Sequence, residues 1–232
     1  MLARLHPERT GALVTLPADR AKGIDVNGWH PIHDFSALPA DLSFVGVKAT
    51  EGNTVTDKAL QAHRDGLRAR PGLDLVIYYH FARTGRPETQ AVRLLDAVGP
   101  LQANERLCLD LEVLPDDPGS VLAWVDAFYG RIRRSCPGQR QLIYTSKRIW
   151  SQFGNPGWAG AADIDLWAPR YNAVGREPEL PAPWTRWTAW QWTDGEAVPF
   201  TCPGVGACDA NVWNGDRAAV RAWVAGKSLL QG

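Results

Sequence analysis

Two carboxylates lie two residues apart in an apolar run, at Asp110 and Glu112 of the stretch RLCLDLEV. In a β-strand, residues two apart point to the same face, so both acids project to one side and the flanking leucines to the other. Their Cα atoms should be about 6.6 Å apart, at a rise of roughly 3.3 Å per residue. Like charges held that close in a partly desolvated place raise one pKa, as a general acid working near neutral pH requires.

Acidic and polar side chains also end the other predicted strands. The strand of Asp110 and Glu112 breaks at LPDDP (114–118), and in parallel α/β sheets and barrels the carboxyl end of the strands is where sites assemble. The residues that recur at such ends are Asp25, Glu51, Tyr79, Asp110, Glu112, Gln191, Trp192 and Asp209. One acid after a strand is usually a helix cap or a turn former, but the recurrence favours a shared acidic cleft.

Short β-rich runs alternate with helical patterns along most of the chain. The predicted strands are 43–49, 74–82, 106–113, 141–146, 165–171 and 186–193. Pro87 and Pro118 stand where helices should begin, and apolar residues recur on one helical face after each. From 155 to 215 helical periodicity is weak. The alternation predicts an α/β fold with a largely parallel sheet, open or closed into a barrel, whose later units have lost their helices.

The composition is that of an ordinary globular protein, with 45% hydrophobic and 22% charged residues among 232. We expect an N-terminal arm over 1–22 and a single catalytic domain over 23–232. The 25 basic and 25 acidic side chains balance, so no net field draws the chain to nucleic acid or to an anionic membrane. No apolar run is long enough for a membrane span, and the first 22 residues lack the apolar core of a classical signal peptide.

The four cysteines lie at positions 108, 136, 202 and 208, without the CxxC spacing of a zinc or redox site. We therefore expect no metal and no cofactor. Cys202 and Cys208 flank the flexible stretch PGVGA, so a local disulfide and two free thiols are both open. Cys108, inside a predicted strand, is expected to be a small buried hydrophobe.

Tryptophan is abundant, with 11 residues in the chain. Core packing explains Trp124 and Trp223, which lie on predicted helical faces. Four others lie beside the acids, where an indole could stack on a sugar ring: Trp29, Trp190, Trp192 and Trp213. Since carbohydrate is the ligand class that uses acids and aromatics together, the pattern favours a glycoside-cleaving site.

Eight stretches between about Gly23 and Gly215 resemble, in order, the glycoside hydrolase family 25 muramidases, the lysozymes of the Chalaropsis type. They are GIDVNGWHP, FVGVKATEG, YYHFAR, LCLDLE, LIYTSKRIW, DLWAPRY, WTAWQWT and CDANVWNGD. The resemblance implies a flattened, helix-depleted TIM-like β/α barrel. It also implies hydrolysis, with retention, of the β-1,4 bond between N-acetylmuramic acid and N-acetylglucosamine in peptidoglycan.

The resemblance also implies roles for individual residues. Glu112 would protonate the leaving oxygen and later activate water, while Asp110 would hold and polarise the substrate 2-acetamido group as an internal nucleophile. Direct attack by Asp110 on the anomeric carbon is the competing mechanism. Asp25 and Asp209 would line the same cleft, tuning Glu112 and binding sugar. The supporting residues would be Glu51, Tyr79, Tyr171, Gln191 and Trp192.

Three positions qualify the resemblance. Asn27 and His30 stand where family members commonly show Ser and Gln, so the family's sugar contacts are not carried over to them. We expect His30 to be a substituted contact or a surface residue, and His80 to be a packed strand histidine.

Two rival functions stay open: a non-catalytic peptidoglycan-binding module of the same fold, and a chitinase-like glycosidase. The expected partner is the peptidoglycan glycan strand, bound by a monomer. The expected route begins in the cytoplasm and reaches the cell wall by holin-dependent release, as for a phage endolysin, or by specialised secretion. A secreted antibacterial effector would add an immunity protein and the secretion machinery as partners.

Overall fold

The computed structural model describes residues 19–113, 121–171 and 177–226 of the chain. Its strands are β1 (Lys22–Val26), β2 (Leu42–Glu51), β3 (Val55–Thr56), β4 (Leu75–Phe81), β5 (Glu105–Asp110), β6 (Gln141–Tyr144), β7 (Ile164–Pro169), β8 (Ala189–Thr193), β9 (Thr201–Cys202), β10 (Gly206–Ala207) and β11 (Asp209–Trp213). Its helices are α1 (Leu60–Ala69), α2 (Pro87–Val98), α3 (Val121–Ser135), α4 (Lys147–Ser151), the short 3-10 helix η2 (Ala159–Ala162) and α5 (Arg217–Val224).

Eight of these strands close into a barrel. Six parallel pairings connect β1, β2, β4, β5, β6, β7 and β8 in that order. Strand β11 fills the gap between β8 and β1 and is antiparallel to both, while β3 only extends β2. The prediction of an α/β barrel is therefore confirmed, with one strand reversed.

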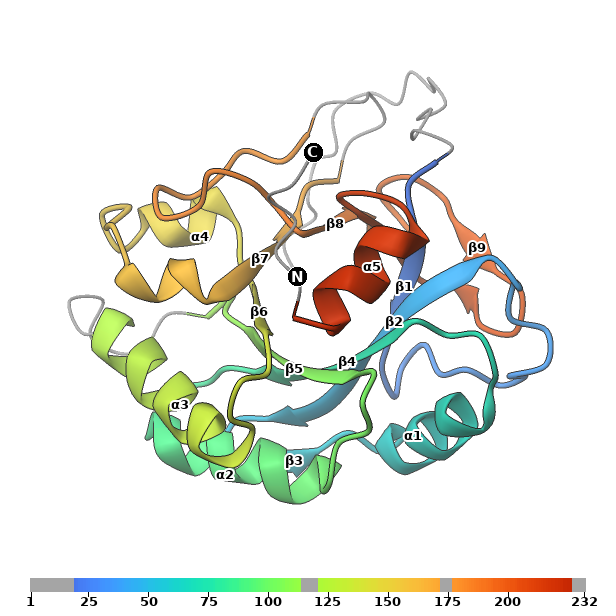
Figure 1. The fold of residues 1–232 in the computed structure, drawn as a ribbon, viewed down its shortest axis with the longest axis horizontal. Helices are drawn as coiled ribbons and strands as arrows, with labels where there is room; N and C mark the ends of the chain where they lie inside the picture. The colour runs from blue at the N-terminus through green and yellow to red at the C-terminus, as the bar shows by residue number, and fades with distance from the viewer. Residues whose placement is uncertain (1–18, 114–120, 172–176, 227–232) are drawn as a thin grey trace, which may run out of the picture.

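Helices α1, α2 and α3 cover the outside of one half of the barrel (Figure 1). Helix α2 begins at Pro87, as expected from a proline that needs no N–H partner in the first turn. Between 155 and 215, the described residues form strands, loops and η2, which confirms the helix-depleted closing third. The expected chain break at 114–118 and residues 1–18 of the expected arm lie outside the described residues.

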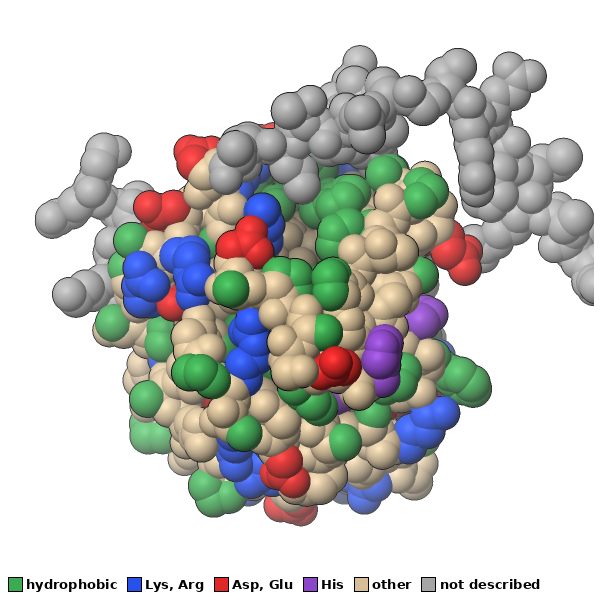
Figure 2. All heavy atoms as spheres, turned by 90° about the vertical axis from the view of Figure 1, so that its right-hand side faces the viewer, with side chains coloured by type: hydrophobic (Ala, Val, Ile, Leu, Met, Phe, Trp, Pro, Cys, Tyr) green, Lys and Arg blue, Asp and Glu red, His purple; other side chains and the backbone are tan. Residues whose placement is uncertain are grey.

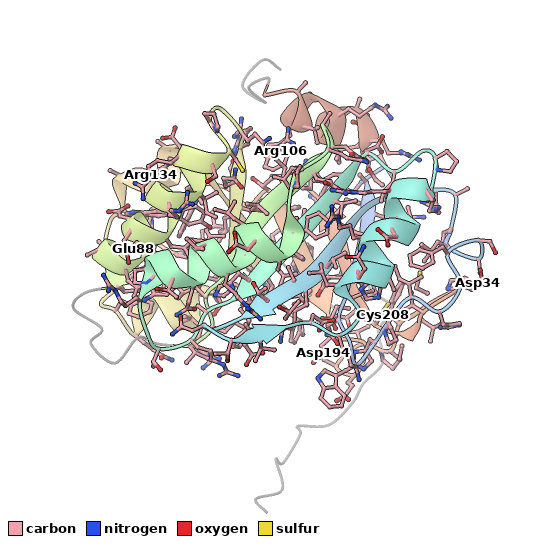
Figure 3. All side chains as sticks on the ribbon, turned by 90° about the horizontal axis from the view of Figure 1, so that it is seen from below. Asp34, Glu88, Arg106, Arg134, Asp194 and Cys208 are labelled. Atoms are coloured by element: carbon pink, nitrogen blue, oxygen red, sulfur yellow. The ribbon has the colours of Figure 1, made fainter. Side chains whose placement is uncertain are left out.

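The barrel has two apolar layers. The outer layer lies between the strands and the helices, and the inner layer fills the barrel with large side chains such as Phe44, Ile77, Trp167 and Trp213. Helix α5 adds Trp223 to the inner layer and thereby closes the amino-terminal end of the barrel. Figure 3 shows Arg106, which donates to the last carbonyl of α5, at this end of the molecule.

The predicted two-residue alternation holds along β5. Cys108 belongs to the inner layer and is buried, as expected, while Leu107 and Leu109 belong to the outer layer. The strand ends at Asp110, three residues before the predicted end. The backbone N–H of Leu111 still donates to the carbonyl of Tyr144, at 2.8 Å, so the extended path leads on toward Glu112.

All four cysteines are buried free thiols in the structure. Cys202 in β9 and Cys208, just before β11, are close enough for their thiols to hydrogen-bond to each other. No helix in the described part of the chain is long and apolar enough to cross a bilayer. On the face shown in Figure 2, basic and acidic side chains are interspersed, in keeping with the balanced charge.

Candidate active site

A cavity of about 200 Å³ opens at the carboxyl end of the barrel strands. Its lining residues are Asp25, Asn27, Lys48, Tyr79, Phe81, Asp110, Glu112, Tyr144, Trp167, Tyr171 and Asp209. The structure thus brings six of the nine predicted site residues to one cavity wall: Asp25, Tyr79, Asp110, Glu112, Tyr171 and Asp209. We refer to it as the acidic cavity, because four carboxylates line it against one lysine.

Asp25 and Asp209 form a carboxyl pair across the antiparallel strands β1 and β11, where they lie directly opposite each other. They hydrogen-bond to each other, which requires a proton between them. Burial first, and the charge of Asp25 second, raise the pKa of Asp209 to about 10. Burial also raises the pKa of Asp25, although hydrogen bonds from Asp209, Asn211 and Gln191 oppose it. Asp209 therefore keeps its proton near neutral pH and can donate it to Asp25.

Gln191 holds this pair in place from β8. Its side-chain Nε2 donates to Asp25 Oδ2 at 2.9 Å and to Asp209 Oδ2 at 3.1 Å. Its Oε1 accepts from Tyr144 Oη at 2.6 Å and from Tyr171 Oη at 2.8 Å. Every polar atom of this buried amide is used, so Gln191 acts as a positioning residue behind the cavity wall rather than as part of it.

Asp110 ends β5 inside the cavity and is only 7% exposed. Its Oδ1 atom is buried and has no hydrogen-bond partner among the described residues. Burial, with the nearby charge of Glu112 as the next cause, raises the pKa of Asp110 well above its ordinary value. A buried acceptor without a donor is costly, so this oxygen is ready to accept a hydrogen bond from a ligand.

Glu112 follows two residues later, at the mouth of the cavity, and is exposed as a whole residue. The protein around its carboxyl nevertheless raises its pKa by desolvation, and the charge of Asp25 adds to the effect. Arg148 and Lys48 act in the opposite direction. A raised pKa keeps the proton on this carboxyl to a higher pH than on an ordinary glutamate, which is the property that a general acid needs.

Glu51 lies behind Lys48 at the end of β2. Its carboxylate pairs with Lys48 Nζ at 2.6 Å and with Arg83 Nη2 at 2.7 Å. Burial alone would raise the pKa of Glu51, but these hydrogen bonds outweigh it and lower the pKa. Glu51 is therefore ionised and positions Lys48, the cation that does line the acidic cavity.

The tryptophans expected beside the acids are placed differently. Trp190 and Trp213 are buried at 2% and 0% exposure, so neither can stack on a sugar. Trp192 points to the outer layer, where its ring packs edge-on against Phe200, and it does not line the acidic cavity. Only Trp29 of the four has an open ring, at 82% exposure, with Lys58 Nζ 4.8 Å from its centroid.

The two histidines of interest lie outside the cavity wall. His80 is buried between Thr50 Oγ1 and Gln90 Oε1, each 2.8 Å from a ring nitrogen. Burial lowers its pKa to about 4, so the ring is neutral and packed at physiological pH. His30 is exposed, and its N–H donates to Asn27 Oδ1 at 3.2 Å. Asn27 itself lines the cavity.

Six residues of the site were not predicted: Asn27, Lys48, Phe81, Tyr144, Trp167 and Asn211. Each lies in a predicted strand or close to a predicted acid, so a count of inward-facing residues near the strand ends could have found them. Asn211 joins the acids to the barrel interior, because it donates to Asp25 Oδ2 at 2.7 Å and accepts from Trp167 Nε1 at 2.8 Å.

A glycine makes room for this arrangement inside the barrel. A Cβ atom at Gly46 would lie 2.6 Å from the Trp167 ring and 2.7 Å from Asp25 Cβ. Both distances are far below a normal carbon contact, so only glycine allows the ring and the acid to approach β2 this closely.

Several known proteins are similar to this chain in sequence or in fold. The N,O-diacetylmuramidase of Chalaropsis sp is 29% identical over 194 residues, which cover 76% of this chain and 89% of that protein. Lysozyme M1 of Streptomyces globisporus is 27% identical over 222 residues, or 89% of this chain and 72% of that protein. The structure of a muramidase from Acremonium alcalophilum superposes with a TM-score of 0.74 at 27% identity, over 90% of this chain and 100% of that one.

The family comparison spans most of the barrel. Residues 24–200 match glycosyl hydrolases family 25, a range that contains Asp25, Asp110, Glu112 and Gln191. The chain therefore belongs to glycosyl hydrolase family 25 and is a glycoside hydrolase.

Proposed function

We propose that this protein is a lysozyme, an N-acetylmuramidase that cleaves the β-1,4 bond between N-acetylmuramic acid and N-acetylglucosamine in peptidoglycan. The observation that carries the proposal is the pair of Asp110 and Glu112, held at the carboxyl end of β5 with raised pKa values in a chain of this family. The relatives named muramidase and lysozyme support the choice of substrate.

Glu112 is the general acid and base of the proposed reaction. Its carboxyl proton passes to the glycosidic oxygen as the bond from that oxygen to the anomeric carbon breaks. In the second step its carboxylate takes a proton from the water that attacks the same carbon. Its place at the mouth of the cavity supports both steps, because leaving group and water need access there.

Asp110 holds the substrate 2-acetamido group in this proposal. The N–H of that group donates to the unpartnered Oδ1, and the carbonyl oxygen attacks the anomeric carbon to form an oxazolinium ring. A donor to Asp110 favours its ionised form, and a negative charge on Asp110 favours the protonated form of Glu112 beside it. Binding of the substrate thereby sets the protonation state that the first step needs.

The Asp25–Asp209 pair supplies a fixed negative charge opposite the reacting carbon. Gln191 and Asn211 hold it without neutralising it, so it stabilises the positive charge that develops on the sugar. Water opens the oxazolinium from the face that the leaving group left. The product therefore keeps the configuration of the substrate.

The test is digestion of purified peptidoglycan, followed by borohydride reduction and mass spectrometry of the fragments. We expect new reduced muramic acid ends, absent with heat-treated protein. Reduced N-acetylglucosamine ends would mean a glucosaminidase instead, and binding without released fragments would mean a binding module. Faster cleavage of chitin than of peptidoglycan would favour the chitinase-like alternative.

A second measurement addresses the mechanism. Proton NMR of the first product formed should show the β-anomer before mutarotation, as retention requires. A 2-deoxy-2-fluoro glycoside lacks the acetamido group. If the acetamido group is the nucleophile, Asp110 forms no bond to the sugar, and this glycoside should not label Asp110. A covalent adduct on Asp110 in the intact-protein mass spectrum would replace the substrate-assisted mechanism with direct attack.

A further inference from the structure

A second pocket, of about 260 Å³, lies beside the acidic cavity and carries the opposite charge. Its lining residues, here called the basic pocket, are Ser146, Lys147, Arg148, Pro169, Arg170 and Glu179. We propose that the basic pocket binds a carboxylate of the peptide that peptidoglycan carries on its muramic acid residues, with Arg148 as the cation that meets it. This proposal rests on the proposed function. It concerns the peptide of the substrate, which the sugar-cleaving residues do not bind.

Two chain segments connect the pocket to the acidic cavity. Tyr144 lines the acidic cavity, and two residues later Ser146 lines the basic pocket. After β7, Arg170 lines the basic pocket and the next residue, Tyr171, lines the acidic cavity. The two tyrosine hydroxyls are 3.3 Å apart. The pockets therefore adjoin each other at the carboxyl ends of β6 and β7, and a substrate in one can extend into the other.

Among the described residues that line the basic pocket, Glu179 is the only acid. It binds Lys147 Nζ at 3.2 Å and Arg170 Nη1 at 3.7 Å. Arg148 is exposed and has no hydrogen bond or ion pair with any residue in the described ranges. The acid that it does influence is Glu112, whose pKa it helps to lower. Arg148 thus presents a guanidinium to the solvent, near enough to Glu112 to influence its charge.

The charges of the substrate match the separation between the acidic cavity and the basic pocket. The sugar rings of peptidoglycan are neutral, whereas the peptide attached to the lactyl group of muramic acid carries free carboxylates. The described lining of the acidic cavity offers a peptide carboxylate one cation, Lys48, and that cation is already paired with Glu51. The peptide carboxylates are therefore better accommodated in the basic pocket. An arginine binds a carboxylate with two parallel hydrogen bonds, which makes Arg148 the suited partner at the adjoining wall.

The experiment compares two forms of one substrate. Soluble glycan fragments with native peptides are prepared, and half of them are treated with carbodiimide and ammonia to convert the peptide carboxylates to amides. We expect the wild-type protein to show a kcat/KM about fivefold higher on the native fragments, the effect of one solvent-exposed ion pair. We expect Arg148→Gln to remove this preference, and Arg148→Lys to retain part of it.

The ratio of the two substrates separates recognition from an effect on Glu112. Loss of the Arg148 charge also raises the pKa of Glu112, but that change lowers the rate on both substrates alike. Arg134→Gln is the matched control, because Arg134 is an exposed arginine in the last turn of α3, on the outside of the barrel (Figure 3). It should keep the fivefold preference.

Two results would overturn the inference. Equal wild-type rates on native and amidated fragments would show that no carboxylate is recognised, and so would an Arg148→Gln variant that keeps the preference. The proposed function stands in both cases, because muramic acid ends are still released. Failure of the wild-type protein to release them from either substrate would instead overturn the proposed function and this inference with it.

Discussion

Strand β5 carries a buried acid at each end, and the two differ in their neighbours. Glu105, the first residue, accepts from Arg68 Nε and Nη2 at 2.7 Å each and from Tyr78 Oη at 2.9 Å. Asp110, the last residue, has an oxygen without a partner and lies near the like charge of Glu112. Burial favours a raised pKa at both, yet the pKa of Glu105 is lowered and that of Asp110 is raised. Hydrogen bonds led by those from Arg68 outweigh burial at Glu105, whereas burial prevails at Asp110, and this distinguishes the structural acid from the reactive one.

The whole barrel repeats this contrast between its ends. At the amino-terminal end, Asp74 is paired with Arg217 and Arg221 and hydrogen-bonded by Ser43, beneath helix α5. At the carboxyl end, Asp25 and Asp209 hydrogen-bond to each other and to uncharged amides instead. Acids held without cations cost stability, and that cost is acceptable where a substrate will supply the missing contacts.

The largest expected effect is on the reaction itself. Glu112→Gln keeps the size of the side chain and removes the proton that it donates, so we expect kcat on peptidoglycan to fall about 10³-fold. The free energy of unfolding should change by less than about 0.5 kcal/mol, because Glu112 is exposed. Release of reduced muramic acid ends and urea unfolding measure the two quantities. An active variant would remove Glu112 from the reaction.

The second prediction separates the two acids of β5. Glu105→Gln breaks a buried ion pair with Arg68, so the free energy of unfolding should fall by about 3 kcal/mol. Activity per folded molecule should stay unchanged. Asp110→Asn should do the reverse, lowering kcat about 100-fold with unfolding unchanged within about 0.5 kcal/mol, since no ion pair is lost. If both variants lose stability equally, the contrast between the ends of β5 is wrong.

The last prediction concerns the pH dependence of stability. The pKa of Asp209 is about 10 in the folded protein and 3.8 ordinarily, so between these values the folded state binds more protons than the unfolded state. The free energy of unfolding contributed by this group must then decrease as pH rises through that window. Asp209→Asn should flatten the decrease between about pH 5 and about pH 9, measured by urea unfolding. An unchanged slope would contradict the raised pKa.

Sequence patterns predicted the parts of the fold that depend on local periodicity. Runs of buried residues predicted β4 and β6, and apolar faces after prolines predicted α2 and α3. Helix α1 was not predicted, because only Leu60, His63 and Leu67 of it are buried and its remaining residues form no broad apolar face. Local patterns also failed to predict burial of the tryptophans. Position in or after a strand could not distinguish Trp190, which is buried, from Trp29, which is exposed.

The sequence by itself determined which face of each strand a side chain occupies, because alternation is a property of adjacent residues. That is why Asp110, Glu112 and Cys108 share the inner side of the barrel. Only the tertiary structure decided which acids have partners. Arg68 is 37 residues from Glu105, and Gln191 is 166 residues from Asp25. Electrostatic neighbours are set by closure of the barrel, so the pKa values, and with them the division between structural and reactive acids, follow from the fold.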